Sequence, residues 1–160
     1  MKKLVQLVAA VFLVCGMTAC FETIDKVYDE GTLIEFQQAI VNTPAVGRTY
    51  PLLATANSTT ATASVTARLN LVGPQRPADL TVRVFVDQGA TTTAPGSFTL
   101  VNGGNVVIPA NQSFGTLTVN VARASAATAP LRNLVLVIDS TSTDFKPSQN
   151  YKRLGYTIRQ

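Results

Sequence analysis

Few side chains in this 160-residue chain could carry out chemistry. Histidine, the commonest general base and metal ligand, is absent. Carboxylates can catalyse hydrolysis in pairs without histidine, as in glycosidases, provided that two of them meet in a cleft. The candidates in the main part of the chain are Glu35, Asp79, Asp87, Asp139 and Asp144. They are scattered, and no Gly-x-Ser-x-Gly elbow, phosphate loop or dinucleotide fingerprint accompanies them. We therefore expect no enzyme activity.

Cys20 is the one residue whose surroundings indicate a definite chemical fate. Two lysines precede an apolar run over residues 4–17, and Thr18-Ala19-Cys20 follows the run. A cationic start, a short apolar core and small residues at the end are typical of a secretory signal, and the run is too short to span a bilayer. A cysteine directly after small residues resembles a lipobox, the recognition site for bacterial lipoprotein processing. We expect residues 4–17 to form an apolar helix within a signal peptide, residues 1–19, that is removed, leaving Cys20 as the acylated N-terminus.

Lipid modification at Cys20 would leave no free thiol in the mature protein. Cys15 would be discarded with the signal peptide, and the thioether would occupy the remaining sulfur. A disulfide, a thiolate nucleophile and a zinc cluster are then all excluded. Phe21, rather than an aspartate, follows Cys20, which argues against retention in the inner membrane. We expect a lipid-anchored protein of the outer membrane, with the periplasmic or cell-surface face left open.

The net charge of +4 is unevenly distributed along the chain. Residues 21–30 contain four acids and one lysine, whereas residues 31–160 contain ten basic and five acidic residues. The chain therefore divides into a signal peptide (1–19), an acylated cysteine with an acidic tether (20–30) and a mildly basic domain (31–160). The tether should repel anionic headgroups and keep the domain away from the membrane. Because the basic residues are scattered, we expect no nucleic acid partner.

The domain carries repeated strand patterns that indicate an all-β fold. Strict alternation of apolar and polar side chains, typical of strands with one buried face, occurs over residues 65–71, 80–86, 117–121 and 153–159. Further strand signals lie at residues 32–37, 49–54, 97–101 and 105–108. Pro51 confines the second of these to a sheet edge. Eight or nine strands fit a two-sheet sandwich, with a closed barrel as the alternative.

One segment, residues 134–138, is apolar throughout. This pattern predicts a central strand that is covered on both faces, or a strand whose outer face meets a partner.

Two stretches between the strands resemble Calx-beta domains. They are residues 92–99 (TTAPGSFT) and 107–119 (VIPANQSFGTLTV), which match a small-Gly-x-aromatic turn, then an apolar-Pro-x-Gly/Asn turn, then a Thr/Val strand. The resemblance covers residues 64–140. It implies an immunoglobulin-like sandwich of about seven to nine strands, used for binding or spacing rather than for chemistry.

The calcium ligands of such domains are not matched here. Ser97 stands at a turn position that is often Asp in the family, and the strand ending at Val121 runs into Ala122-Arg123-Ala124. Calcium needs about six to eight oxygen ligands, several of them carboxylates. Three scattered aspartates at loop ends do not meet that need, so we expect no metal and no cofactor.

Four residues are candidates for ligand binding: Phe85, Tyr151, Lys152 and Arg153. Glycan sites favour aromatic platforms, and Tyr151 with Tyr156, near the two basic residues, could form one. The alternative is that Tyr151 only stands at a strand entrance. Tyr156 alternates with apolar neighbours, so it should belong to the core. Phe85 lies on the polar face of its strand, where it marks an interface or is covered by the proline-rich loop 74–77.

These observations predict a non-catalytic outer-membrane lipoprotein that acts as a binding or accessory module of a cell-envelope assembly. The role would be glycan capture or adhesion, and the partners would be the membrane, through the lipid on Cys20, and a glycan or envelope protein. The alternative is a structural subunit that docks through a strand edge or an apolar face. A carboxylate-dependent hydrolase is the last alternative.

Overall fold

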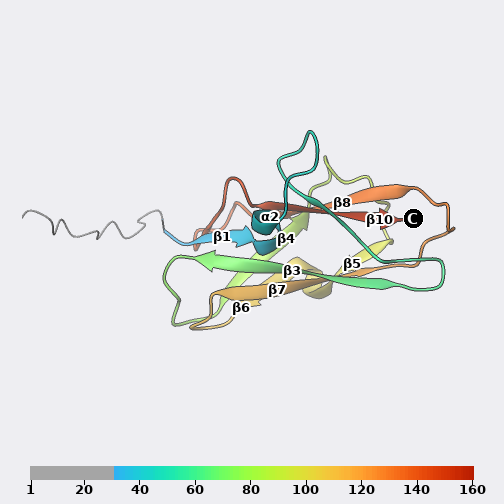
Figure 1. Cartoon of the computed structure of the whole chain (residues 1–160). Coiled ribbons are helices and arrows are strands. Elements are labelled where there is room, and N and C mark those ends of the chain that lie inside the picture. Colours follow the sequence, from blue (N-terminus) through green and yellow to red (C-terminus); the bar gives the residue numbers. More distant parts are fainter. Residues whose placement is uncertain (1–30) are drawn as a thin grey trace, which may run out of the picture. The chain divides into compact units, whose positions relative to one another are not determined.

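Two five-stranded β-sheets face each other in residues 31–160, the residues that the computed structural model describes (Figure 1). In spatial order, the first sheet contains β5 (Phe98–Leu100), β7 (Phe114–Val121), β3 (Ala63–Val72), β1 (Leu33–Phe36) and β9 (Lys146–Pro147). The second sheet contains β2 (Leu52–Ala54), β10 (Arg153–Arg159), β8 (Leu131–Ile138), β4 (Leu80–Val86) and β6 (Asn105–Ile108). The prediction of an all-β, two-sheet sandwich is confirmed. The predicted signal-peptide helix, Cys20 and the acidic tether lie outside the described residues.

The sequence patterns did not reveal the short strand β9. It has two residues, one of them Pro147, so neither alternation nor β propensity marks it. It pairs in parallel with β1, and the Lys146 N–H donates to the Thr32 carbonyl oxygen at 2.9 Å. With β9 the described residues form ten strands, one more than the upper limit of the predicted seven to nine.

The core lies between the sheets and consists of the residues that the alternation patterns turn inward. On β3, β4 and β7 the buried set is Ala67, Leu69, Leu71, Leu80, Val82, Val84, Leu117, Val119 and Val121. On β10 the buried alternation includes Tyr156, which is 2% exposed, so the prediction that it belongs to the core is confirmed. Burial of these apolar side chains is the main force holding the sheets together.

The apolar strand β8 occupies the middle of the second sheet and is covered on both faces. Leu134 and Leu136 face the core, while Val135 is also fully buried although it points outward. Its cross-strand neighbour Gly155 shows what covers it, because a Cβ at that position would overlap the side chain of Leu52. The chain entering β2 therefore packs over the outer face, so the first of the two alternatives for this segment is correct.

The N-terminal strand is shorter than the sequence predicts. The pattern indicates a strand over residues 32–37, whereas β1 ends at Phe36 and the chain turns into α2 (Gln37–Val41). A five-residue helix is too short to show a 3.6-residue periodicity, so the pattern does not distinguish it from a strand end. The chain then runs through a loop into β2 at the edge of the second sheet, as Pro51 predicts. Neither helix among residues 31–160 is long and apolar enough to cross a membrane.

The chain crosses from the first sheet to the second between β5 and β6. The crossing is made by η1 (Val101–Gly104), in which Asn102, Gly103 and Gly104 all have positive φ. At Gly104 a Cβ would overlap the carbonyl oxygen of Val84, so only glycine fits this close approach of two backbones.

Candidate binding site

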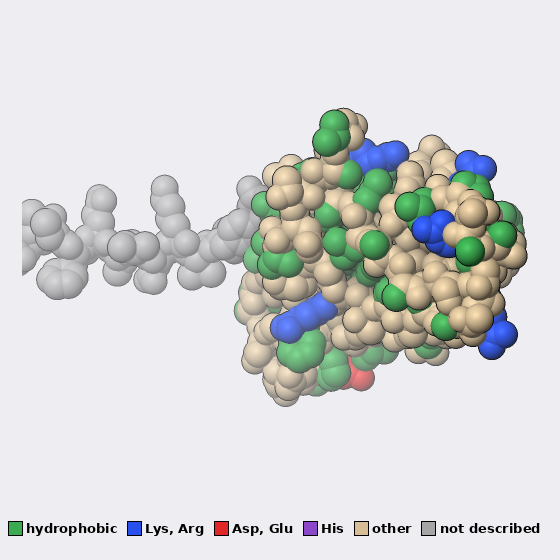
Figure 2. All heavy atoms as spheres, turned by 45° about the vertical axis from the view of Figure 1, so that its right-hand side comes forward, with side chains coloured by type: hydrophobic (Ala, Val, Ile, Leu, Met, Phe, Trp, Pro, Cys, Tyr) green, Lys and Arg blue, Asp and Glu red, His purple; other side chains and the backbone are tan. Residues whose placement is uncertain are grey.

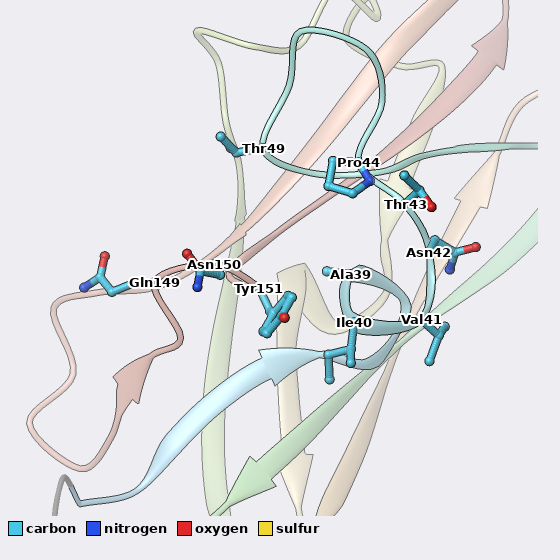
Figure 3. A pocket seen from close by; sticks show the side chains of 10 residues that line it. All are labelled: Ala39, Ile40, Val41, Asn42, Thr43, Pro44, Thr49, Gln149, Asn150 and Tyr151. Atoms are coloured by element: carbon cyan, nitrogen blue, oxygen red, sulfur yellow. The ribbon is translucent and has the colours of Figure 1, made fainter.

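A cavity of about 550 Å³ opens where α2 and the loop after it meet the turn between β9 and β10 (Figure 3). The N-terminal side contributes Ala39, Ile40, Val41, Asn42, Thr43, Pro44 and Thr49, and the turn contributes Gln149, Asn150 and Tyr151. Figure 3 shows the Tyr151 ring between the side chains of Asn150 and Ile40. We call this cavity the Tyr151 pocket.

Backbone hydrogen bonds fix the two sides of the Tyr151 pocket to each other. The Phe36 N–H, at the end of β1, donates to the Tyr151 carbonyl oxygen at 3.0 Å. At the other end of α2, Asn42 closes the helix, because its backbone N–H and its Nδ2 both donate to the Gln38 carbonyl oxygen, at 3.2 and 2.8 Å. The helix and the turn are therefore held in place without a ligand.

The side chain of Gln38 anchors α2 to the first sheet. Its Nε2 donates to the carbonyl oxygen of Thr66 at 3.0 Å, and its Oε1 accepts from the N–H of Arg68 at 3.1 Å. β1 pairs with β3 only opposite Leu69–Val72. Beyond Leu69, the side-chain amide of Gln38 supplies β3 with the donor and the acceptor that a further β1 residue would otherwise provide. The register of β3 thus determines where α2 lies, and with it one wall of the pocket.

The lining combines exposed apolar surface with polar groups that have no partner in residues 31–160. Ile40 is 40% exposed, Val41 65% and Tyr151 36%. The side chains of Thr43, Thr49, Asn150 and Tyr151 make no hydrogen bond within that part of the chain, and none of the lining residues is charged. A concave surface with an aromatic ring, aliphatic groups and available amides and hydroxyls is suited to binding a small polar ligand.

The structure divides the four predicted site residues between two places. Tyr151 lines the pocket, and Lys152 lies beside it, with its Nζ donating to Gln149 Oε1 at 3.3 Å. Arg153 instead points to the outer face of the second sheet, where its Nη2 lies 3.1 Å from Asp87 Oδ2. Of the expected platform, Tyr151 and Lys152 remain together and Arg153 is separated from them. The reason is that Tyr151 lies in the turn before β10, whereas Arg153 is the first residue of that strand and follows its alternation.

Phe85 belongs to the same outer face as Arg153. Both are cross-strand neighbours of Val137, Phe85 from β4 and Arg153 from β10. The Phe85 ring is half-buried, and the guanidinium carbon of Arg83 lies 4.5 Å from its centroid. The sequence left two alternatives for Phe85, an interface or a cover by the loop 74–77. In the structure the Arg83 guanidinium covers the Phe85 ring.

Sequence reasoning missed most of the pocket, including Ile40, Val41, Thr49 and Asn150. These residues lie in a short helix and in turns, where no periodicity marks them. Their association depends on β1 and the β9–β10 turn coming together, which is a tertiary contact between segments far apart in the chain.

The acidic residues are dispersed and each has its own local role. Asp139 accepts from the N–H and the Oγ1 of Thr141, both at 2.8 Å, and these bonds lower the pKa of its carboxyl group. Asp79 accepts from the N–H of Ala110 at 2.8 Å, and Asp144 lies 3.9 Å from Arg76. Glu35 is partly buried, which raises the pKa of its carboxyl group.

No three acidic, cysteine or histidine side chains gather in a metal-binding arrangement within residues 31–160. The lysines and arginines are likewise separated from one another on the face that Figure 2 shows. A second cavity of about 460 Å³ lies beside β3, β5 and β7, lined by Phe98 among others, but the half-buried Phe98 packs against the core. The Tyr151 pocket is the one of the two that contains an exposed aromatic ring.

Comparison with known proteins shows the fold. No protein-family model matches the chain, and no curated protein matches it. The sandwich superposes on a two-domain protein of unknown function from Bacteroides fragilis with a TM-score of 0.49 and 8% identity, covering 81% of this chain and 45% of that one. For EndoBT-3987 from Bacteroides thetaiotamicron, solved with a Man5GlcNAc product, the TM-score is 0.50 at 16% identity, covering 68% and 28%.

The Calx CBD1 domain in its apo form gives a TM-score of 0.52 at 11% identity, covering 79% of this chain and 96% of that domain. The chain thus spans nearly the whole of a Calx domain but less than half of each Bacteroides protein. At these identities the likeness concerns the fold alone: residues 31–160 form a β-sandwich similar to that of a Calx domain.

Proposed function

We propose that this protein is a lipid-anchored, non-catalytic binding or accessory module of a bacterial cell-envelope assembly, held at the outer membrane through an acylated Cys20. The observation that carries the binding role is the Tyr151 pocket, a concave site with an uncharged lining and an exposed aromatic ring. The sequence Thr18-Ala19-Cys20 supports the anchor. The likeness to Calx CBD1 supports an immunoglobulin-like domain of the Calx-beta type.

Within this role, the ligand we assign to the pocket is a glycan. Sugar rings have apolar C–H faces that pack on aromatic and aliphatic side chains, and hydroxyl groups that bond to amides and hydroxyls. Tyr151, Ile40 and Asn150 offer both kinds of contact. None of the carboxylates of residues 31–160 lines the pocket, which supports capture without acid–base catalysis.

The test is a pull-down from detergent-solubilised envelope with the tagged full chain, beside the variants Cys20→Ser and Tyr151→Ala. We expect the full chain to incorporate a labelled fatty acid and Cys20→Ser to incorporate none, because serine cannot form the thioether. An envelope polysaccharide or protein should co-purify with the full chain and be lost with Tyr151→Ala.

The matched control for this test is Phe114→Ala, which removes another exposed aromatic ring that does not line the pocket. Fatty-acid labelling of Cys20→Ser at the level of the parent chain would contradict the anchor. Equal recovery of envelope material with Tyr151→Ala and with the control would contradict the binding role.

The second candidate function is that of a structural subunit that docks through an apolar face. β8 does not provide this face because it is buried, but Val41 is 65% exposed and Val46, in the loop after α2, is fully exposed. Exposed aliphatic groups at the end of a helix and in the loop after it favour a protein partner. In that case Val46→Ser should abolish recovery of the partner protein, whereas Tyr151→Phe should leave it unchanged.

A further inference from the structure

Two aromatic side chains are exposed in residues 31–160, Phe114 and Tyr151, and an arginine covers only the first. The half-buried Phe98 packs against the core instead. The guanidinium carbon of Arg68 lies 4.0 Å from the Phe114 ring centroid, that of Arg83 lies 4.5 Å from Phe85, and that of Arg48 lies 5.6 Å from Tyr50. Stacked guanidinium groups occupy the π-faces that a ligand would need.

No arginine or lysine stacks on the ring of Tyr151 within the described residues. Its side chain is exposed at the centre of a cavity instead of on a flat strand face. Of the aromatic residues that are exposed in this part of the chain, Tyr151 is thus the one whose ring remains available for stacking.

None of the residues that line the Tyr151 pocket is charged, so a charged ligand would find no ion-pair partner among them. The nearest cation in the sequence is Lys152, and its Nζ donates to Gln149 Oε1 at the rim. A carboxylate or sulfate brought into the cavity would lose water without gaining an ion pair, and an ammonium group would find no carboxylate. The polar groups that remain are the Asn150 amide and the Thr43 and Thr49 hydroxyls, which bond equally well to neutral hydroxyl groups.

The walls of the pocket are held before any ligand arrives. The bonds from Phe36 to Tyr151, from Asn42 to Gln38 and from Gln38 to β3 connect α2, the turn and the sheet. A pre-organised site avoids the entropic cost of ordering loops on binding, which matters for sugars because each contact is weak.

We propose that the Tyr151 pocket binds a neutral saccharide, with the C–H face of one sugar ring stacked on Tyr151 and its hydroxyl groups bonded to Asn150 and the two threonines. This inference rests on the proposed function and specifies the ligand class of the same site. Uronic and sulfated sugars are disfavoured because none of the lining residues is cationic and Lys152, at the rim, is hydrogen-bonded to Gln149. Stacking on an uncovered aromatic ring provides most of the affinity.

The experiment titrates the full chain, kept in a zwitterionic detergent without sugar headgroups, with oligosaccharides of glucose, galactose, mannose and N-acetylglucosamine, and with oligogalacturonate as the charged counterpart. Calorimetry and saturation-transfer NMR report the affinity and the sugar protons in contact. We expect at least one neutral oligosaccharide to bind about tenfold more tightly than the uronate.

The variants separate stacking from hydrogen bonding. Tyr151→Ala should lower the affinity about tenfold or more, as loss of an aromatic anchor does, whereas Tyr151→Phe should retain most of it. Asn150→Ala should weaken binding by a smaller factor, and Phe114→Ala should leave it unchanged. Circular dichroism of each variant verifies that the sandwich is intact.

The inference is overturned if no neutral oligosaccharide binds, if the uronate binds as well, or if Tyr151→Ala behaves like Phe114→Ala. Failure here is distinguishable from failure of the proposed function. If the envelope pull-down recovers a protein that depends on the pocket while every saccharide fails, the binding module stands and the neutral saccharide is wrong. If both experiments fail, the proposed function is wrong as well.

Discussion

The hydroxyl group of Tyr156 donates a hydrogen bond to the backbone carbonyl oxygen of Thr66, 3.1 Å away in the opposite sheet. The same oxygen accepts a bond from Gln38 Nε2. β1 ends before it reaches this part of β3, so the two side chains satisfy an acceptor that lacks a β1 partner. A core residue of the second sheet, a strand of the first and the helix beside the pocket therefore meet at one carbonyl oxygen.

Replacing Tyr156 by phenylalanine tests the bond between the sheets. The ring and its packing remain, and Thr66 keeps its bond from Gln38, so the loss is that of one partly buried hydrogen bond. We expect Tyr156→Phe to lower the free energy of unfolding by about 0.5–1.5 kcal/mol, measured by urea denaturation. An unchanged urea midpoint would show that the bond contributes nothing to stability.

Stability should also decrease at high pH because of Tyr156. Burial raises the pKa of its phenol above the ordinary value of about 10, since the folded protein disfavours the phenolate. The unfolded chain then releases this proton at a lower pH than the folded chain does. The contribution to stability is complete below about pH 10 and is lost progressively as the pH rises from there toward the folded-state pKa.

Urea midpoints measured from about pH 8 to about pH 11 check this dependence, with Tyr156→Phe as the reference. The midpoint of the parent protein should decrease more steeply than that of the variant above about pH 10. Parallel curves for the two proteins would contradict the assignment to Tyr156.

Loss of the Gln38 amide should loosen one wall of the pocket. Gln38→Ala removes the bonds to Thr66 and Arg68, and we expect a loss of about 0.5–1.5 kcal/mol in unfolding free energy. Hydrogen exchange in α2 should accelerate, because the helix is too short to persist without tertiary support. The matched control is Gln112→Ala, an exposed glutamine whose side chain makes no hydrogen bond in residues 31–160, and equal exchange in both variants would refute the anchoring role.

The crossing between the sheets offers a comparison of two adjacent glycines. Both have positive φ, but a Cβ at Gly103 meets nothing within 4 Å, whereas one at Gly104 would overlap the Val84 carbonyl oxygen. Gly103→Ala should therefore cost only the backbone strain, about 1–2 kcal/mol. Gly104→Ala should cost clearly more, because the backbone must also shift. Thermal denaturation of the pair measures the difference, and equal losses would mean that the crossing can relax.

The sequence predicts much of the sandwich because its strands follow simple rules. Alternation in β3, β4, β7 and β10 indicates which residues face the core, Tyr156 included, and the uninterrupted apolar run marks β8 as the central strand. Pro51 marks an edge because it lacks the N–H that a central strand needs. These signals are local and depend on a period of two.

The candidate site is harder to predict because its geometry is not local. Tyr151 is recognisable as an aromatic residue near a strand entrance, but the helix that faces it has five residues and no periodicity. Arg153 lies only two positions away, yet it pairs with Asp87 because β10 begins there and directs it to the outer face of the second sheet. No pattern in the sequence connects Tyr151 with Ile40 or Thr49, since that contact arises from the docking of β1 against the β9–β10 turn.

The position of β1 has a mechanical consequence for a protein held by its N-terminus. β1 lies between β3 and β9, and its last residue, Phe36, bonds to Tyr151 at the pocket. Tension between an anchor at Cys20 and a ligand in the pocket would therefore run along the strand. Such tension would act in shear on all the hydrogen bonds from β1 to β3 and β9 at once, instead of breaking these bonds one after another. With the proposed anchor and ligand both in place, the rate of forced unfolding of β1 would limit how long the attachment lasts, beside the affinity of the pocket.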